Sequence, residues 1–194
     1  MDKVEAGISG TGVDIGEIFD RYYRPGSDLA KMMRVHGCRV RDKALAAAEA
    51  VAHQNPDLDF IAEAALLHDI GIFKTNAPGI GCHGSEPYVR HGVIGRRILE
   101  NLGLARHALV CERHVGVGLT ASDIRSQRLP LPLRDMVPVS IEEILICYAD
   151  KFFSKSGQGR ELPLKAIVDE LNRFGQDKAR LFLAWHERFK RCQQ

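Results

Sequence analysis

Apolar residues recur at intervals of three and four along most of this chain, the spacing of one face of an α-helix. Runs in which Val, Ile or Thr alternate with polar residues, the usual signal of strands, are missing from the sequence. The pattern predicts a short helix over residues 14–22, further helices from Ser27, Asp57 or Asp59, His91, Ala105 and Ser140, and two amphipathic helices over residues 162–174 and 177–190. We therefore expect an all-α helical bundle with extra C-terminal helices.

Local signals predict where several of these helices begin and end. Ser140 followed by Glu143 predicts a capping box at the start of one helix. Gly71 is expected to follow another helix as its C′ residue, which places His68 and Asp69 in the last turn. Residues 75–87 are rich in turn-forming types and predict a loop, and residues 120–138 have no clean helical period.

The chain has 194 residues, about the length of one domain. We expect a single domain over residues 1–194, with a core at about 27–154. A glycine-rich tail at about 1–13 and packing helices at about 162–192 would flank this core.

Charge and cysteine content narrow the partners and the compartment. Because 27 Lys and Arg face 25 Asp and Glu, the net charge is only +2, which predicts neither a nucleic-acid polymer nor a membrane surface as partner. The five cysteines form an odd set without a CxxC pair, as expected for reduced thiols in the cytoplasm. No leader segment and no apolar run of about 18 residues is evident, so we expect a soluble cytoplasmic protein.

Polar residues interrupt the apolar faces of five predicted helical segments. They are all types that bind metals, namely His36, His68, Asp69, His91, His114 and Asp150. A single histidine on an apolar face is usually a hydrogen-bonded core residue, and we weigh each one against that alternative. Together they are harder to explain, because a buried unpaired carboxylate costs several kcal/mol. A shared metal site accounts for all six.

The donor types and their spacing predict the kind of metal site. In a final helical turn, His68 and Asp69 can lie on either side of one site, so that Asp69 bridges two ions. His68 would then bind one ion, and His91 and His114 would supply the other. Nitrogen and oxygen donors without thiolate suit an open catalytic site for two divalent ions of Fe, Mn, Co, Ni or Zn.

The order His36, His68-Asp69 and Asp150 resembles the signature of the HD superfamily of metal-dependent phosphohydrolases. Residues 67–71 are similar to the HDIG variant of that signature, and the resemblance covers about residues 31–153. It implies a binuclear site in which His91 and His114 are the additional ligands. Within the superfamily the chain resembles the small stand-alone HDIG proteins, which include symmetric diadenosine tetraphosphate hydrolases. The Gly-Tyr-Pro element of the cyclic-dinucleotide phosphodiesterases is absent, and the dGTP hydrolases are much longer.

The expected reaction is hydrolysis of a phosphoester or phosphoanhydride in a small phosphorylated substrate, a nucleotide or dinucleoside polyphosphate. Asp69 and His68 are the catalytic candidates, with Asp69 orienting the nucleophile. Lys74 is the candidate for binding substrate phosphate, because it leads from the predicted site toward its mouth. The sequence does not assign roles to Lys151, His107 and the Cys82-His83 pair. The oligomeric state is also open, and a homodimer is possible.

Two alternatives from other functional classes are kept. The chain could be a metal-binding regulatory domain that senses a nucleotide without turnover. It could also be a mixed-valent di-iron oxygenase, because some HD-fold proteins use the same helical ligand set with iron and dioxygen.

Overall fold

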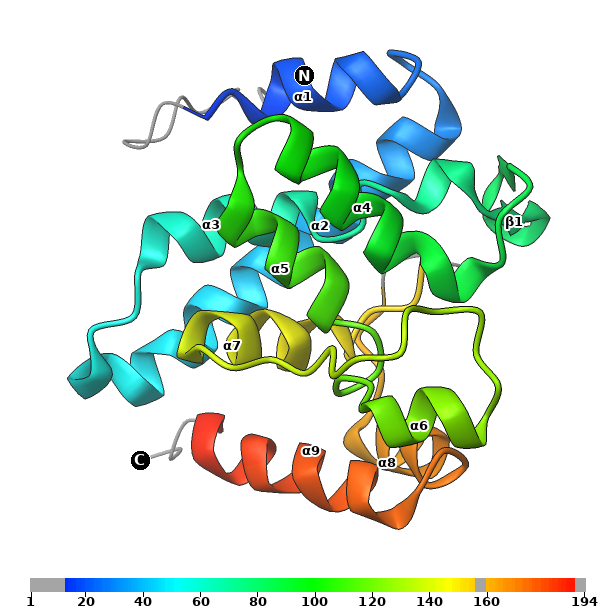
Figure 1. Cartoon of the computed structure of the whole chain (residues 1–194). Helices are drawn as coiled ribbons and strands as arrows, with labels where there is room; N and C mark the ends of the chain where they lie inside the picture. Colours follow the sequence, from blue (N-terminus) through cyan, green and yellow to red (C-terminus); the bar gives the residue numbers. More distant parts are fainter. Residues whose placement is uncertain (1–12, 156–159, 191–194) are drawn as a thin grey trace.

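The computed structural model describes residues 13–155 and 160–190, and this part of the chain confirms the all-α fold (Figure 1). The α-helices are α1 (Ile15–Tyr22), α2 (Asp28–Ala48), α3 (Leu58–Leu67), α4 (His91–Asn101), α5 (Ala105–Arg113), α6 (Ala121–Ser126), α7 (Ile141–Asp150), α8 (Leu164–Asn172) and α9 (Gln176–Phe189). The strands β1 (Asn76–Ala77) and β2 (Cys82–His83) pair in an antiparallel hairpin. No helix among the described residues is both long enough and apolar enough to cross a membrane.

The molecule has α1 at one end and the pair α8 and α9 at the other, with α2, α3, α5 and α7 between them (Figure 1). Two clusters of buried apolar side chains hold these layers together. One cluster joins α2, α3, α7 and α9, and the other joins α1, α2 and α4. On α2, Met33 belongs to the second cluster and Val40 to the first, with His36 between them. His36 therefore lies where the two apolar clusters meet on α2.

The predicted helix starts agree closely with the structure because short polar side chains cap them. In each case a side-chain oxygen accepts a hydrogen bond from an amide of the first turn. These caps are Asp14, Ser27, Asp57 and Ser140. The predicted helices over residues 162–174 and 177–190 correspond to α8 and α9, with ends that differ by one or two residues.

Several local details differ from the predictions. Glu143 does not complete a capping box with Ser140, because its carboxylate accepts from the Val139 amide at 2.7 Å and pairs with Arg113. The reciprocal capping box belongs to Thr120 and Asp123, which open α6 inside a segment that has no helical period. The predicted loop at residues 75–87 contains the β1–β2 hairpin, whose strands of two residues are too short to show alternation.

Gly71 is not a helix C′ residue, because α3 ends at Leu67 with His68 as its C-cap. A glycine is required at this position for another reason. A Cβ at Gly71 would lie 2.4 Å from the His91 carbonyl oxygen and 2.4 Å from the Gly95 amide nitrogen. The backbone that follows His68 and Asp69 thus packs directly on the backbone of α4, which carries His91.

Gly71→Ala is expected to lower the free energy of unfolding by about 1–3 kcal/mol, because the added methyl group has to push two backbones apart. Gly79→Ala is the control, since nothing lies within 4 Å of a Cβ at that position. Urea denaturation measures both variants. Equal stability of the two variants would contradict the close contact between Gly71 and α4.

Asp57 links the start of α3 to α5, and its effect on stability should depend on pH. Its Oδ1 accepts from the Phe60 amide at 3.0 Å and its Oδ2 from the Arg106 guanidinium at 2.9 Å. These two hydrogen bonds lower the pKa of Asp57 below its ordinary value of 3.8. A lowered carboxyl pKa gives stability that is present above the ordinary value and is lost as the pH falls through the folded-state pKa.

Asp57→Ala is therefore expected to cost about 1 kcal/mol of unfolding free energy at neutral pH. The difference from wild type should shrink below about pH 4. Asp57→Asn keeps a cap but removes the charge, so it should be less destabilising at neutral pH. Urea denaturation at several pH values tests this, and an alanine effect that stays constant down to about pH 2.5 would contradict it.

Candidate metal centre

The structure brings all six predicted metal-binding candidates together in two buried groups that share one residue. The first group is His36, His68, Asp69 and Asp150. The second group is Asp69, His91 and His114. Most of these residues lie at helix ends: His68 and Asp69 follow α3, His91 opens α4, His114 caps α5 and Asp150 ends α7.

The first group surrounds one point with two imidazoles and two carboxylates. His36 Nε2 lies 3.0 Å from Asp150 Oδ1 and 3.3 Å from Asp69 Oδ2. His68 Nε2 lies 3.0 Å from Asp69 Oδ2 and 3.4 Å from Asp150 Oδ1. Four potential ligand atoms from α2, α7 and the end of α3 thus face each other.

The second group uses the other oxygen of Asp69. His91 Nε2 and His114 Nε2 are 3.1 Å apart. Each of these two nitrogens lies 3.4 Å from Asp69 Oδ1. Asp69 therefore has Oδ2 in the first group and Oδ1 in the second, so that each group contains one oxygen of the shared carboxylate.

Backbone carbonyls fix the orientation of three histidine rings. Nδ1 of His68 lies 2.7 Å from Ala65 O, Nδ1 of His91 lies 2.7 Å from Tyr88 O, and Nδ1 of His114 lies 2.8 Å from Cys111 O. Each carbonyl comes from the residue three positions earlier, in a helical turn. Because a carbonyl only accepts, Nδ1 is the donor and the lone pair of a neutral ring lies on Nε2. In their neutral forms, His91 and His114 therefore turn the lone pairs of their Nε2 atoms toward the same point, where a cation could be bound.

Burial and the local charges set the protonation of the centre. Burial lowers the pKa of His91 to about 3, so its ring is neutral. Burial also opposes the charge on Asp69, but Lys155 and His68 outweigh this effect and hold the pKa of Asp69 well below its usual range. For His68 burial is outweighed by Asp69 and Asp150, which raise its pKa to about 10. Metal binding must then displace a proton from His68.

The residues fit divalent metal ions. Both carboxylate oxygens of Asp69 are buried. Oδ2 lies 2.7 Å from Lys155 Nζ, whereas Oδ1 has no hydrogen-bond partner within residues 13–155 and 160–190 and lies 3.4 Å from Nε2 of His91 and of His114. A buried carboxylate oxygen without a partner is costly unless a donor or a cation lies beside it. Imidazole and carboxylate donors without thiolate suit an open site better than a closed structural zinc. These buried groups could therefore hold divalent metal ions.

Lys155 was not among the predicted site residues, yet its Nζ lies 2.7 Å from Asp69 Oδ2. Its side chain is 11% exposed, and the residue comes five positions after Asp150, beyond the end of α7. Helical periodicity gives no signal there. Lys155 supplies a buried positive charge directly beside the shared carboxylate.

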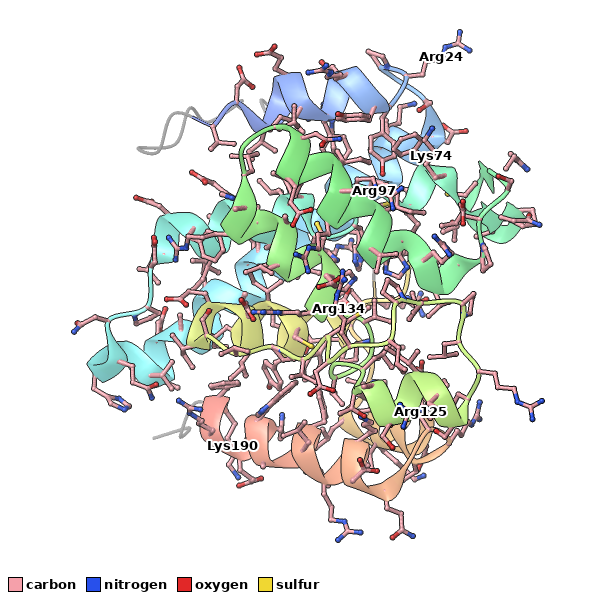
Figure 2. All side chains as sticks on the ribbon, in the orientation of Figure 1. Arg24, Lys74, Arg97, Arg125, Arg134 and Lys190 are labelled. Carbon is pink, nitrogen blue, oxygen red and sulfur yellow. The ribbon has the colours of Figure 1, made fainter. Side chains whose placement is uncertain are left out.

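Lys74, the predicted phosphate ligand, is not brought to the centre. It is exposed, with its Nζ 5.4 Å from the centroid of the neighbouring Phe73 ring. Figure 2 shows Lys74 in the upper part of the view, and α7, labelled in Figure 1, runs below it. Lys74 also does not line the cavity that reaches the centre. Lys155, and not Lys74, lines the cavity beside the centre.

The structure also places the residues whose roles the sequence did not assign. Lys151 lines the cavity, with its Nζ 3.6 Å from Asp150 Oδ2. His107 lies outside both groups and pairs with buried Glu63 at 2.9 Å. Cys82 is buried in β2 and His83 is exposed, and neither lines the cavity.

A cavity of about 700 Å³ opens onto the centre. His91, His114 and Asp150 form part of its wall, and Lys151 and Lys155 lie beside them. The wall continues through residues 115–119 and on to α8. This volume is typical of a small-molecule pocket.

Two of the relatives that the chain resembles are tRNA-modifying enzymes, and another is uncharacterized. The uncharacterized protein, from Methanocaldococcus jannaschii, is 38% identical over 95 residues, which is 48% of each chain. A tRNA (cytidine(56)-2'-O)-methyltransferase of Picrophilus torridus is 35% identical over 115 residues, 59% of this chain and 29% of that enzyme. The enzyme of the same name from Thermoplasma volcanium is 32% identical over 126 residues, 64% of this chain and 32% of that enzyme. The chain thus spans half or less of the length of these curated relatives, and no solved structure matches it.

The model of the HD domain family matches residues 34–154. This segment contains all six residues of the two buried groups. Because it is more than half of the sequence, the chain belongs to the HD domain family.

Proposed function

We propose that the chain is a binuclear metal-dependent phosphohydrolase that cleaves a phosphoester or phosphoanhydride of a small molecule. The observation that carries this proposal is the position of Asp69, whose two oxygens belong to two different groups of buried imidazoles. One ion would be held by the first group and one by the second. Fe, Mn, Co, Ni or Zn suit these donors.

The chain's own residues would position the substrate. Bound divalent ions would activate water and polarise the phosphorus–oxygen bond. Lys155 and Lys151 lie in the same wall and would neutralise phosphate oxygens through charge-assisted hydrogen bonds. In the hydrolysis the water oxygen bonds to phosphorus, the bond from phosphorus to the leaving oxygen breaks, and the leaving oxygen receives a proton.

A nucleotide or dinucleoside polyphosphate is the first substrate to examine. Two relatives bear the name of tRNA methyltransferases, which supports a substrate derived from nucleotides. The size of the cavity supports a small molecule rather than a polymer.

The proposal is tested by product analysis after incubation with Mn, Fe(II) or Co and a panel of phosphate compounds that includes diadenosine tetraphosphate. We expect metal-dependent cleavage of at least one compound, and ADP would identify symmetric hydrolysis of diadenosine tetraphosphate. Full recovery of every compound from metal-loaded protein would overturn the proposal. In that case a bound nucleotide would favour the sensor alternative, and oxygen consumption would favour the oxygenase.

The second ion has its own test. His114→Ala is expected to reduce the metal content from two ions per chain to one, because the second group loses one of its two imidazoles. His107→Ala is the matched control, a buried histidine that pairs with Glu63 outside both groups. Elemental analysis of folded, desalted protein measures the metal content. Two ions in His114→Ala, or a lost ion in His107→Ala, would contradict the assignment.

A further inference from the structure

Beyond its metal end, the cavity has predominantly apolar walls. These side chains come from the segments after α5, α6 and α7 and from α8 and its end. They are Val115, Val117, Leu119, Leu129, Phe153, Leu162, Leu171 and Phe174. Val115 and Phe153 lie close in sequence to the metal-site residues His114 and Asp150, so the apolar surface begins beside the centre.

Most charged or polar side chains in the described part of this wall already have partners. Lys178 pairs with Asp123 and donates to the Gly118 carbonyl. Lys155 pairs with Asp69, and Ser154 is not without a partner either. Gln127 and Glu170 are exposed. Tyr88 and Lys151 also line the cavity, beside the centre. Between these residues and exposed Gln127 and Glu170 the wall is mainly apolar, so few groups there can replace the hydrogen bonds of a buried sugar.

Part of the backbone of this wall is hydrogen-bonded as well. The amide of Leu119 donates to Met136 O at 2.9 Å, and the Met136 amide donates back to Leu119 O at 2.7 Å. The Gly118 amide donates to Val115 O at 3.0 Å. A sugar buried here would lose its hydrogen bonds to water without full replacement, which costs free energy for each hydroxyl group.

We infer that the cavity takes a phosphate compound whose organic group is mainly apolar, either alkyl or aromatic, rather than a sugar. This inference rests on the proposed phosphohydrolase function. Within that function it favours phosphate compounds with an apolar organic group over the nucleotides and dinucleoside polyphosphates named above. The phosphate would lie at the end formed by Lys151, Lys155 and the metal-site residues. The organic group would lie against Phe153, Leu129 and their apolar neighbours.

A series of n-alkylphosphonates from ethyl to octyl tests the inference, because these compounds bind like phosphates but are not hydrolysed. Calorimetry with metal-loaded protein measures each Kd. We expect Kd to fall about fourfold for each methylene group that enters the cavity. AMP and glucose 6-phosphate, as polar comparators, should bind more weakly than octylphosphonate.

Two variants show whether the wall causes the trend. Leu129→Gln and Leu162→Gln each place an amide in the wall and should flatten the dependence of Kd on chain length. Leu133→Gln is the matched control, because Leu133 is 56% exposed and does not line the cavity. It should keep the wild-type dependence.

The outcomes separate the inference from the proposed function. A Kd that is independent of chain length, or tighter binding of AMP than of octylphosphonate, would overturn the inference alone if the protein still hydrolyses phosphate compounds. A dependence unchanged in both wall variants would also overturn it. No binding by any phosphonate, together with no hydrolysis of any compound, would overturn both.

Discussion

Asp69→Asn is expected to lower metal-dependent turnover by more than about 100-fold, since even residues that only support metal ligands change affinity or activity by 10–100-fold. Asp69 is the single residue common to both groups. Its replacement removes the one negative charge that the two groups share and leaves an amide, whose NH₂ end cannot bind a metal ion. The variant should also hold fewer than two ions per chain.

Glu63→Gln is the matched control for Asp69→Asn. Glu63 is also a buried carboxylate beside a histidine, but it lies outside both groups. Metal content and turnover of the two folded variants are compared, and circular dichroism checks their helix content. Asp69→Asn with wild-type turnover would contradict the role of Asp69, and so would equal losses in the two variants.

Lys155→Met is expected to change metal affinity and substrate affinity in opposite directions. Removal of a positive charge 2.7 Å from Asp69 Oδ2 should raise the affinity for divalent ions about tenfold or more. The same change removes a charged donor for phosphate, so KM should rise about tenfold or more. In the metal-free variant, the buried negative charge of Asp69 no longer has the positive charge of Lys155 beside it. Metal binding should therefore raise the Tm of the variant more than the Tm of wild type.

Lys74→Met is the control for Lys155→Met, because Lys74 is exposed and lies outside the cavity wall. It should leave metal affinity and KM unchanged. Competition with a chelator gives the metal affinity, and initial rates give KM. If Lys74→Met raised KM while Lys155→Met did not, the original prediction from the sequence would be preferred.

The sequence was sufficient to predict residues whose positions follow from helical geometry. His36 lies among apolar residues at intervals of three and four, and His91 opens a helix with a clear apolar face. For these residues, the apolar side of a helix is also the side that faces the centre. Ser27 and Ser140 could be predicted as helix starts because a cap and the amide it binds are three residues apart.

The remaining features depend on contacts between distant parts of the chain. Lys155 lies beyond the end of α7, where no period indicates direction. Gly71 was assigned to a helix end, although its small size is required by the backbone of α4, about 20 residues further on. The apolar cavity wall combines segments after α5, α6 and α7 with α8, and no local pattern predicts that combination.

The central claim is that Asp69 bridges two metal ions in one buried centre. Anomalous diffraction from crystals of Mn-loaded protein tests it most directly. We predict two peaks, one among His36, His68, Asp69 and Asp150 and one among Asp69, His91 and His114. A single peak, or peaks outside these groups, would contradict the binuclear centre.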